Sequence, residues 1–185
     1  MKTLHCSLGS NGLTMLHILG IMLFLAMWAP SMHALADNAM LQHATVADQI
    51  LVDKSDRKLM LLKAGEVLRS FDVSLGLNPS GPKRREGDFK TPEGVYSLEA
   101  KNKNSDFFLS IKISYPNPSD RNKAAQLGVQ PGGQIMIHGQ PNEPKHPATS
   151  YQGRDWTDGC IAVSNGDMVD IWLMTEVGTS IEIQP

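Results

Sequence analysis

The sequence has few cysteines and no surplus of either charge. Only two of its 185 residues are cysteine, Cys6 and Cys160, and its 17 basic side chains are balanced by 19 acidic ones. The one basic cluster is the Lys-Arg-Arg run at residues 83–85. Because a nucleic-acid binder needs a strongly basic surface, this composition argues against nucleic acid as a partner. The 41% hydrophobic and 19% charged content is that of a globular protein and excludes a low-complexity chain.

Hydrophobic runs long enough to span a membrane are also lacking. The longest uninterrupted one, residues 18–29, falls short of the ~20 residues that a spanning helix needs. It follows Lys2 and a polar stretch and precedes Ala34-Leu35-Ala36, a pattern typical of a secretory signal peptide. We therefore expect residues 1–36 to be a signal peptide cleaved after Ala36, with a retained membrane anchor as the alternative. Residues 37–48 are then a polar lead-in to a single domain over residues 49–185.

Cleavage would leave one cysteine in the exported chain. Cys6 departs with the signal peptide, so Cys160 has no partner for an intramolecular disulfide. A lone thiol outside the cytoplasm is exposed to oxidation. Its presence indicates either deep burial or a chemical task.

Short runs with a period of two dominate from Gln49 onward. We expect strands at residues 50–52, 58–62, 71–75, 94–99, 107–114, 134–138, 160–163 and 180–183. The clearest alternation sets Leu109, Ile111 and Ile113 against Ser110, Lys112 and Ser114.

Two helices have start and stop signals. One covers residues 119–127, capped by Ser119 and ended by Gly128. The other begins after Ser164 or Asn165, ends before Gly178, and carries Met168, Ile171, Trp172 and Thr175 on one face. The pattern predicts a mainly β fold, a mixed β-sandwich or barrel with two short helices.

The candidate chemistry lies in residues 135–139 and 155–165. A free thiol has a pKa of about 8.5, so a nucleophilic cysteine needs a base or a nearby positive charge. His138, at the end of an expected strand, is the natural base for Cys160. Gly159 has no side chain, so a carbonyl substrate can approach the backbone just before the cysteine. The amides of Gly159 and Cys160 could then donate hydrogen bonds to an oxyanion.

These residues leave two alternatives open. A histidine at a strand end is often structural, so the Cys160 and His138 pair alone is a modest signal. A metal site is a rival, drawn from His43, His138, His146, Cys160, Asp155 and Asp158. No C-x-x-C or H-E-x-x-H spacing is present, so we expect no metal.

Several segments together are far more specific. They are Ile137-His138-Gly139, Thr157-Asp158-Gly159-Cys160-Ile161, Asn165, and upstream residues 52–55, 75–76, 87–96 and 127–133. In these the sequence resembles the L,D-transpeptidase catalytic-domain family (YkuD-type) from residue 50 to about 185, and in Asp-Trp-Thr-Asp-Gly-Cys it is similar to Gram-negative members.

The resemblance implies a function and a set of site residues. Cys160 would be the nucleophile, His138 the general base and proton donor, and Gly159 a backbone amide donor to the oxyanion. The substrate-binding residues would be Gly139, Thr157, Asp158, Arg154, Trp156 and Asn165. A peptidoglycan stem peptide would acylate Cys160 and lose D-alanine, and a second stem's amine would take the thioester to give a 3-3 cross-link. An outer-membrane lipoprotein is a further candidate partner, the compartment would be the periplasm, and neither a metal nor a cofactor would be needed.

Two positions depart from the family pattern. Asp158 replaces the usual histidine and would raise the pKa of Cys160 if the two lie close, unless it orients His138, binds the incoming amine or forms a turn. Ala162 replaces a frequent arginine, and Arg154 is the candidate replacement cation. Lys83, with its two arginine neighbours, is expected in a solvated loop, and Trp156 in the core or the pocket wall.

The competing functions are of two kinds. A hydrolase on the same scaffold would cut stem or lipoprotein linkages with water as the acceptor. A non-catalytic wall-binding module would leave Cys160 idle, but the presence of His138, Gly159 and Cys160 together argues against it.

Overall fold

Eight strands form one mixed sheet in the computed structural model, which describes residues 46–185. The strands are β1 (Gln49–Asp53), β2 (Lys58–Lys63), β3 (Glu66–Asp72), β4 (Gly94–Ser105), β5 (Phe108–Ile113), β6 (Met136–His138), β7 (Ile161–Ala162) and β8 (Ser180–Gln184). Their order in the sheet is β3-β2-β1-β8-β4-β5-β6-β7, with parallel pairs at β1/β8 and β6/β7.

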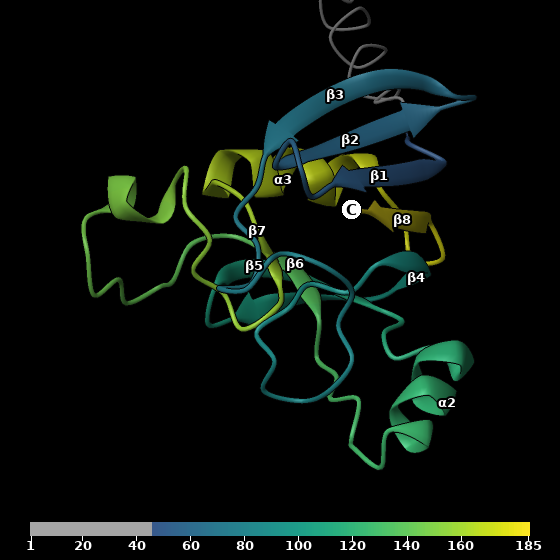
Figure 1. Ribbon diagram of the computed structural model, residues 1–185. Coiled ribbons are helices and arrows are strands. Elements are labelled where there is room, and N and C mark those ends of the chain that lie inside the picture. Colours follow the sequence, from purple (N-terminus) through teal and green to yellow (C-terminus); the bar gives the residue numbers. More distant parts are fainter. Residues whose placement is uncertain (1–45) are drawn as a thin grey trace, which may run out of the picture. The chain divides into compact units, whose positions relative to one another are not determined.

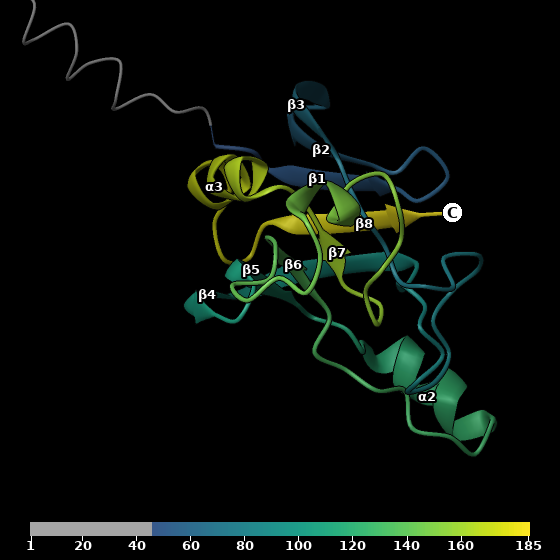
Figure 2. The same ribbon diagram turned by 90° about the vertical axis from the view of Figure 1, so that its left-hand side faces the viewer.

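The sheet folds back on itself into two layers. Figures 1 and 2 show β3, β2, β1 and β8 lying over β4, β5 and β6. The two edges meet where Ser74, just after β3, pairs with Ala162 of β7. Because this contact nearly closes the sheet, the expected mainly β fold of sandwich or barrel type is confirmed.

The core lies between these layers and follows from strand alternation. In β1, Ile50 and Val52 are fully buried while the intervening residues are half exposed. The same period buries alternate leucines or isoleucines in β2, β5 and β8, whereas β3 buries only Phe71. The largest fully buried side chains are Ile50, Leu59, Leu61, Leu75, Leu98, Ile111, Ile113, Ile137, Ile161, Met168, Ile171 and Ile181.

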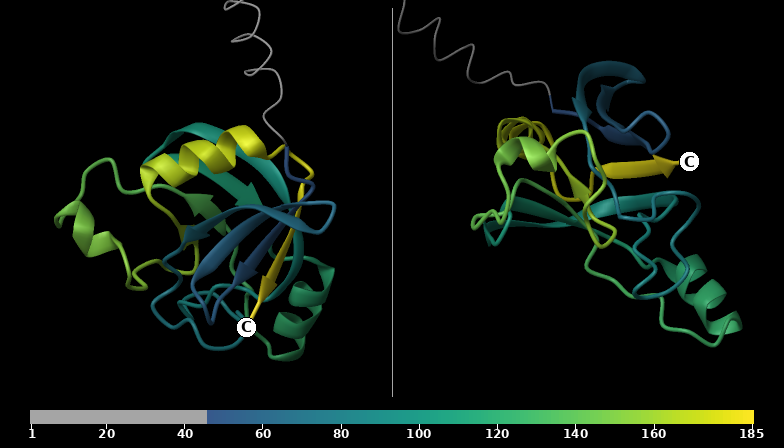
Figure 3. Two further views of the ribbon diagram at one scale, coloured as in Figure 1. Left: turned by 90° about the horizontal axis from the view of Figure 1, so that it is seen from above. Right: turned by 60° about the vertical axis from the view of Figure 1, so that its left-hand side comes forward.

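Two α-helices occur within residues 46–185. In α3 (Asn165–Met174), Ser164 caps the N-terminus by accepting a hydrogen bond from the amide of Asp167, and Met168 and Ile171 enter the core, as expected. The helix packs against β5 along one side of the molecule (Figure 3). The other helix, α2 (Pro118–Gln126), stands apart from the two layers (Figure 1).

The predicted start of α2 was wrong. Asn117, not Ser119, is the N-cap: its side chain accepts from the amide of Asp120, whose carboxylate accepts from the amide of Asn117. This reciprocal capping box satisfies two otherwise unpaired donors, and proline fits the first helical turn because it has no amide to satisfy.

Two strand boundaries also differ from the prediction. The sequence predicted a strand at residues 71–75, but β3 runs from Glu66 to Asp72. The prediction missed most of this edge strand because it is largely exposed and has no apolar alternation. β4 continues to Ser105, beyond the predicted end at residue 99, through a polar stretch paired with β5. The burial of Ser110 also differs from the prediction. Ser110 lies on the polar side of β5, which the alternation set apart from the apolar side, yet it is only 1% exposed.

The expected export signal falls outside the described residues. Residues 1–36 and most of the predicted lead-in at 37–48 belong to that part of the chain. Among residues 46–185, neither helix has the length and apolar character to cross a bilayer.

Candidate active site

A pocket of about 610 Å³ contains the predicted nucleophile and base. The parallel pairing of β6 and β7 places Ile137 opposite Ile161 and His138 opposite Ala162. The same register brings Cys160 beside Met136, so the thiol and the imidazole lie on one face of neighbouring strands. The lining residues are Asn102, Asn104, Ser105, Asp106, Phe107, Ser110, Gly133, Gln134, Ile135, Met136, His138, Trp156, Thr157, Asp158 and Cys160.

His138 is buried and held in one orientation. Its Nδ1 lies 2.8 Å from the carbonyl oxygen of Gly139. Because a carbonyl can only accept, Nδ1 carries the proton and Nε2 is the basic nitrogen. The ring also packs against Phe107 and Trp156, at centroid distances of 4.6 and 5.7 Å. Burial lowers the pKa of His138, a shift that the bond to Gly139 partly opposes, so the imidazole is neutral near pH 7.

Cys160 is a thiol rather than a thiolate at rest. Burial raises its pKa, and the negative charge of Asp158 raises it further. A hydrogen bond from the backbone amide of Met136 and the positive charge of Lys83 act in the opposite direction. The pair therefore begins as neutral thiol and neutral imidazole, and attack on a substrate requires His138 to remove the thiol proton.

The cation near the thiol is Lys83. The run at residues 83–85 was expected in a solvated loop, which is correct for the two exposed arginines and wrong for Lys83, which is 8% exposed. Its ammonium donates to Asp88 Oδ1 at 2.7 Å and to the Arg85 carbonyl at 3.1 Å. Arg154, the predicted replacement for the family's arginine, lies outside the catalytic pocket and lines a neighbouring one.

Removing the charge of Asp158 should make the thiol more reactive. In the Asp158→Asn variant we expect the pKa of Cys160 to fall and the thiolate fraction at pH 7 to rise. Since Asp158 is exposed and its field is screened, the rate of alkylation by iodoacetamide should rise by only about twofold to fivefold. Asp106→Asn is the matched control, because Asp106 lines the same pocket without shifting the pKa of Cys160. An unchanged or slower alkylation rate of Asp158→Asn would contradict this electrostatic role.

Gly159 is required by packing rather than by open access to substrate. Its φ is +133°, and a Cβ atom there would lie 2.5 Å from the carbonyl oxygen of Lys90. Its amide donates to Thr157 Oγ1 at 3.1 Å, and the Thr157 hydroxyl donates to the Cys160 carbonyl at 2.8 Å. These bonds fix the turn that presents the nucleophile.

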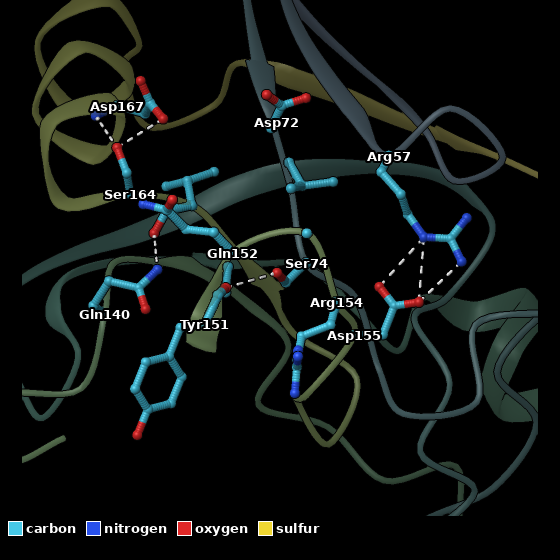
Figure 4. A pocket seen from close by; sticks show the side chains of 14 residues that line it. Arg57, Asp72, Ser74, Gln140, Tyr151, Gln152, Arg154, Asp155, Ser164 and Asp167 are labelled. Carbon is cyan, nitrogen blue, oxygen red and sulfur yellow. Dashed lines mark hydrogen bonds and ion pairs between the residues drawn. The ribbon is translucent and has the colours of Figure 1, made fainter. Parts of the chain in front are cut away.

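Asp155 anchors the loop that leads to this turn, a role that the sequence did not reveal. Its carboxylate accepts from Arg57 Nη2 at 2.9 Å and from the amide of Leu75 at 2.8 Å. Figure 4 shows the Arg57–Asp155 pair at one side of a second pocket, of about 700 Å³. Arg57 lies 98 residues away in sequence, so no local pattern could indicate the pair.

The structure brings most of the predicted site residues together. Cys160, His138, Trp156, Thr157 and Asp158 line one pocket, with Trp156 as part of its wall. Gly139 contributes its carbonyl to His138.

Two other predicted residues lie elsewhere. Asn165 supports the loop after His138, since its side-chain oxygen accepts from the amide of Gln140 at 2.7 Å. Arg154 lines the second pocket (Figure 4). Within residues 46–185, no three histidine, cysteine or acidic side chains converge as a metal-ligand set.

Comparison with known proteins agrees with this geometry. The chain is 36% identical over 96 residues to YafK of Escherichia coli K12, which is named provisionally as an L,D-transpeptidase; the match spans 49% of this chain and 37% of YafK. The fold is similar to Pgp2, the helical cell shape determining protein of Campylobacter jejuni, with a TM-score of 0.55 and 27% identity over 74% of this chain and 46% of Pgp2. It is also similar to Bd1075 of Bdellovibrio bacteriovorus, with a TM-score of 0.50 and 25% identity over 73% of this chain and 46% of Bd1075.

The chain thus spans less than half the length of each of these relatives. The sequence profile of the YkuD family, described as the L,D-transpeptidase catalytic domain, matches residues 47–183. That span includes the whole sheet apart from Gln184 at the end of β8, both helices and every residue of the catalytic pocket. The chain therefore belongs to the L,D-transpeptidase catalytic domain family.

Proposed function

We propose that this protein is an exported cysteine acyltransferase that acts on peptidoglycan stem peptides. The observation that carries the proposal is the buried, neutral His138, fixed by the Gly139 carbonyl on the strand beside Cys160 in a single pocket. A thiol and an oriented base in this arrangement are the parts that acyl transfer through a thioester needs. Pgp2 is a helical cell shape determining protein, which connects a related fold with cell shape.

The proposed reaction has two steps. His138 Nε2 takes the proton of Cys160 as sulfur attacks the carbonyl of the L-to-D peptide bond after the third stem residue. The C–N bond breaks, His138 returns the proton to the departing amine, and D-alanine leaves. An amine of a second stem peptide or of a lipoprotein then attacks the thioester, with His138 accepting its proton and the Cys160 thiol as leaving group.

The oxyanion formed in each step needs backbone donors. The amide of Gly159, which the sequence indicated as an oxyanion donor, is already bonded to Thr157 Oγ1, so we assign this task to the amide of Cys160 instead.

The charges of the pocket support an amine acceptor. Among its lining residues, Asp106 and Asp158 are acidic and none is lysine or arginine. Two carboxylates favour an ammonium group over a carboxylate in the same space. The amine must lose a proton before it attacks, so these carboxylates position it and His138 deprotonates it.

The acceptor decides between a transferase and a hydrolase. We expect incubation with a tetrapeptide muropeptide and a free amino acid as amine donor to release D-alanine and to incorporate the amine. A well-oriented amine outcompetes water because positioning is equivalent to an effective concentration of ~10⁵ M or more. Release of D-alanine or of a lipoprotein remnant with water as the sole acceptor would assign the hydrolase function instead.

Export is proposed from the sequence of residues 1–36. Intact-mass measurement of the protein recovered from the periplasm should show a chain that begins at Asp37, because the apolar run and Ala34-Leu35-Ala36 provide a signal-peptidase site. A periplasmic or membrane fraction that retains Met1 would overturn this proposal in favour of an anchored protein.

A further inference from the structure

Ser110 is a buried polar residue of the pocket for which the reaction described above has no use. It is 1% exposed, and its hydroxyl has no hydrogen-bond partner among residues 46–185. Buried hydroxyl groups are nearly always bonded, because an unpaired one loses its bonds to water without compensation. Since Ser110 lines the catalytic pocket, a molecule bound in that pocket can supply the missing partner.

The strand register places this hydroxyl beside the reacting groups. Ser110 of β5 pairs with His138 of β6 on one side and with Asn102 of β4 on the other. Side chains directly opposite each other in neighbouring antiparallel strands lie about 5 Å apart and on one face of the sheet. Asn102, Ser110 and His138 therefore form a polar row across three strands, and all three line the pocket.

The chemistry of the row fits a peptide. A hydroxyl both donates and accepts, and a side-chain amide does the same, so the row can pair with the N–H and C=O groups of an extended chain. Apolar side chains flank it, with Phe107 next to His138 and Met136 next to Cys160.

We propose that Ser110 is a substrate-binding residue whose hydroxyl bonds to the backbone of the acyl donor next to the bond that is cleaved. This role rests on the proposed function, because it takes the donor to be a stem peptide. Ser110 holds the donor in both the ground state and the transition state, so its loss weakens binding more than it slows the chemical step.

The test compares binding with stability. In a Cys160→Ala background, which cannot be acylated, the affinity for a synthetic stem tetrapeptide ending in D-alanine is measured by isothermal titration calorimetry. Addition of Ser110→Ala should weaken binding by about tenfold, the usual effect of one lost buried hydrogen bond. The midpoint of thermal unfolding should stay the same or rise, because the free protein loses no internal bond.

Thr175→Val is the matched control. Thr175 is also 1% exposed, but its hydroxyl donates to the Ile171 carbonyl at 2.7 Å, away from the pocket. Its replacement should lower the midpoint by a few degrees, about 2–6 °C, and leave tetrapeptide affinity unchanged. Affinity that falls in Ser110→Ala, with a midpoint that falls only in Thr175→Val, would distinguish a hydroxyl that binds substrate from one that stabilises the fold.

Kinetics provide a second readout in the Cys160 protein. Ser110→Ala should raise KM about tenfold with little change in kcat and no shift of the pH profile. An unchanged KM with a shifted pH profile would mean that Ser110 acts through His138, which overturns the proposal.

The outcomes are distinguishable. Equal tetrapeptide affinity with and without Ser110→Ala overturns the role of Ser110 alone. No tetrapeptide binding by the Cys160→Ala protein overturns the proposed function and, with it, the role of Ser110.

Discussion

Replacement of Cys160 by alanine should abolish turnover of a tetrapeptide muropeptide. Without sulfur, no thioester can form, and no other described cysteine can replace it. Loss of a covalent nucleophile lowers kcat by many orders of magnitude, so we expect a fall of ~10³-fold or more, to the detection limit of a D-alanine release assay.

This loss should occur without unfolding. The Cys160 sulfur lies 3.5 Å from the Gln134 carbonyl and accepts a hydrogen bond from the amide of Met136, and both contacts are weak because sulfur is a poor donor and a poor acceptor. Cys6→Ala in the full-length chain is the matched control and should keep full activity. Retained activity of Cys160→Ala would show that another group performs the reaction.

Replacement of His138 by glutamine should have the second-largest effect. The variant keeps a polar side chain of similar length but loses the base, and general-base assistance typically contributes ~10²–10⁴-fold. We therefore expect a fall of that size in the rate of Cys160 acylation, measured by rapid quench and mass spectrometry. His146→Gln is the matched control, because His146 is exposed and lies outside the catalytic pocket.

The pH dependence tests the same role. Burial lowers the pKa of His138 below its ordinary value of 6.5, and the imidazole is active only when neutral. The acylation rate of the unmodified protein should therefore fall at acidic pH with a midpoint below 6.5, as His138 becomes protonated. A rate that falls already above pH 7, or a His138→Gln variant with the original rate, would contradict the assignment of His138 as base.

Much of the fold and the reacting pair could be predicted because local patterns encode them. The alternation of Ile135 and Ile137 with Met136 and His138 indicated which face carries the imidazole, and the register of β6 with β7 puts Cys160 on that face. The start of α3 was equally local, since Ser164 caps the helix whose Met168 enters the core.

The alternation could not distinguish solvent from a pocket. Ser110 lies on the polar side of β5 with Lys112, and both positions fit a solvent-facing strand edge. Only the fold shows that Ser110 lines a pocket together with Trp156 and Phe107, whereas Lys112 pairs with Glu99 near the surface at 3.0 Å. An alternating pattern shows which face of a strand is polar, but it does not show whether that face lies against solvent or against a pocket.

Long-range ion pairs could not be predicted from the sequence either. Lys54 is 3% exposed, with its ammonium 2.7 Å from Glu93 Oε1 and 3.1 Å from the Thr91 carbonyl. This pair ties the turn after β1 to the start of β4, as Arg57 and Asp155 tie the same turn to the catalytic loop. Charged residues in turns are usually solvated, so the burial of Lys54 follows only from the packed chain.

The intact mass of the protein during turnover tests the central claim most directly. A brief incubation with a stem tetrapeptide, quenched in acid, should add the mass of the tetrapeptide less D-alanine, and peptide mapping should place this adduct on Cys160. The adduct should disappear when a free amine is added, as the thioester is transferred. Product formation without any adduct, or an adduct on a residue other than Cys160, would contradict the account.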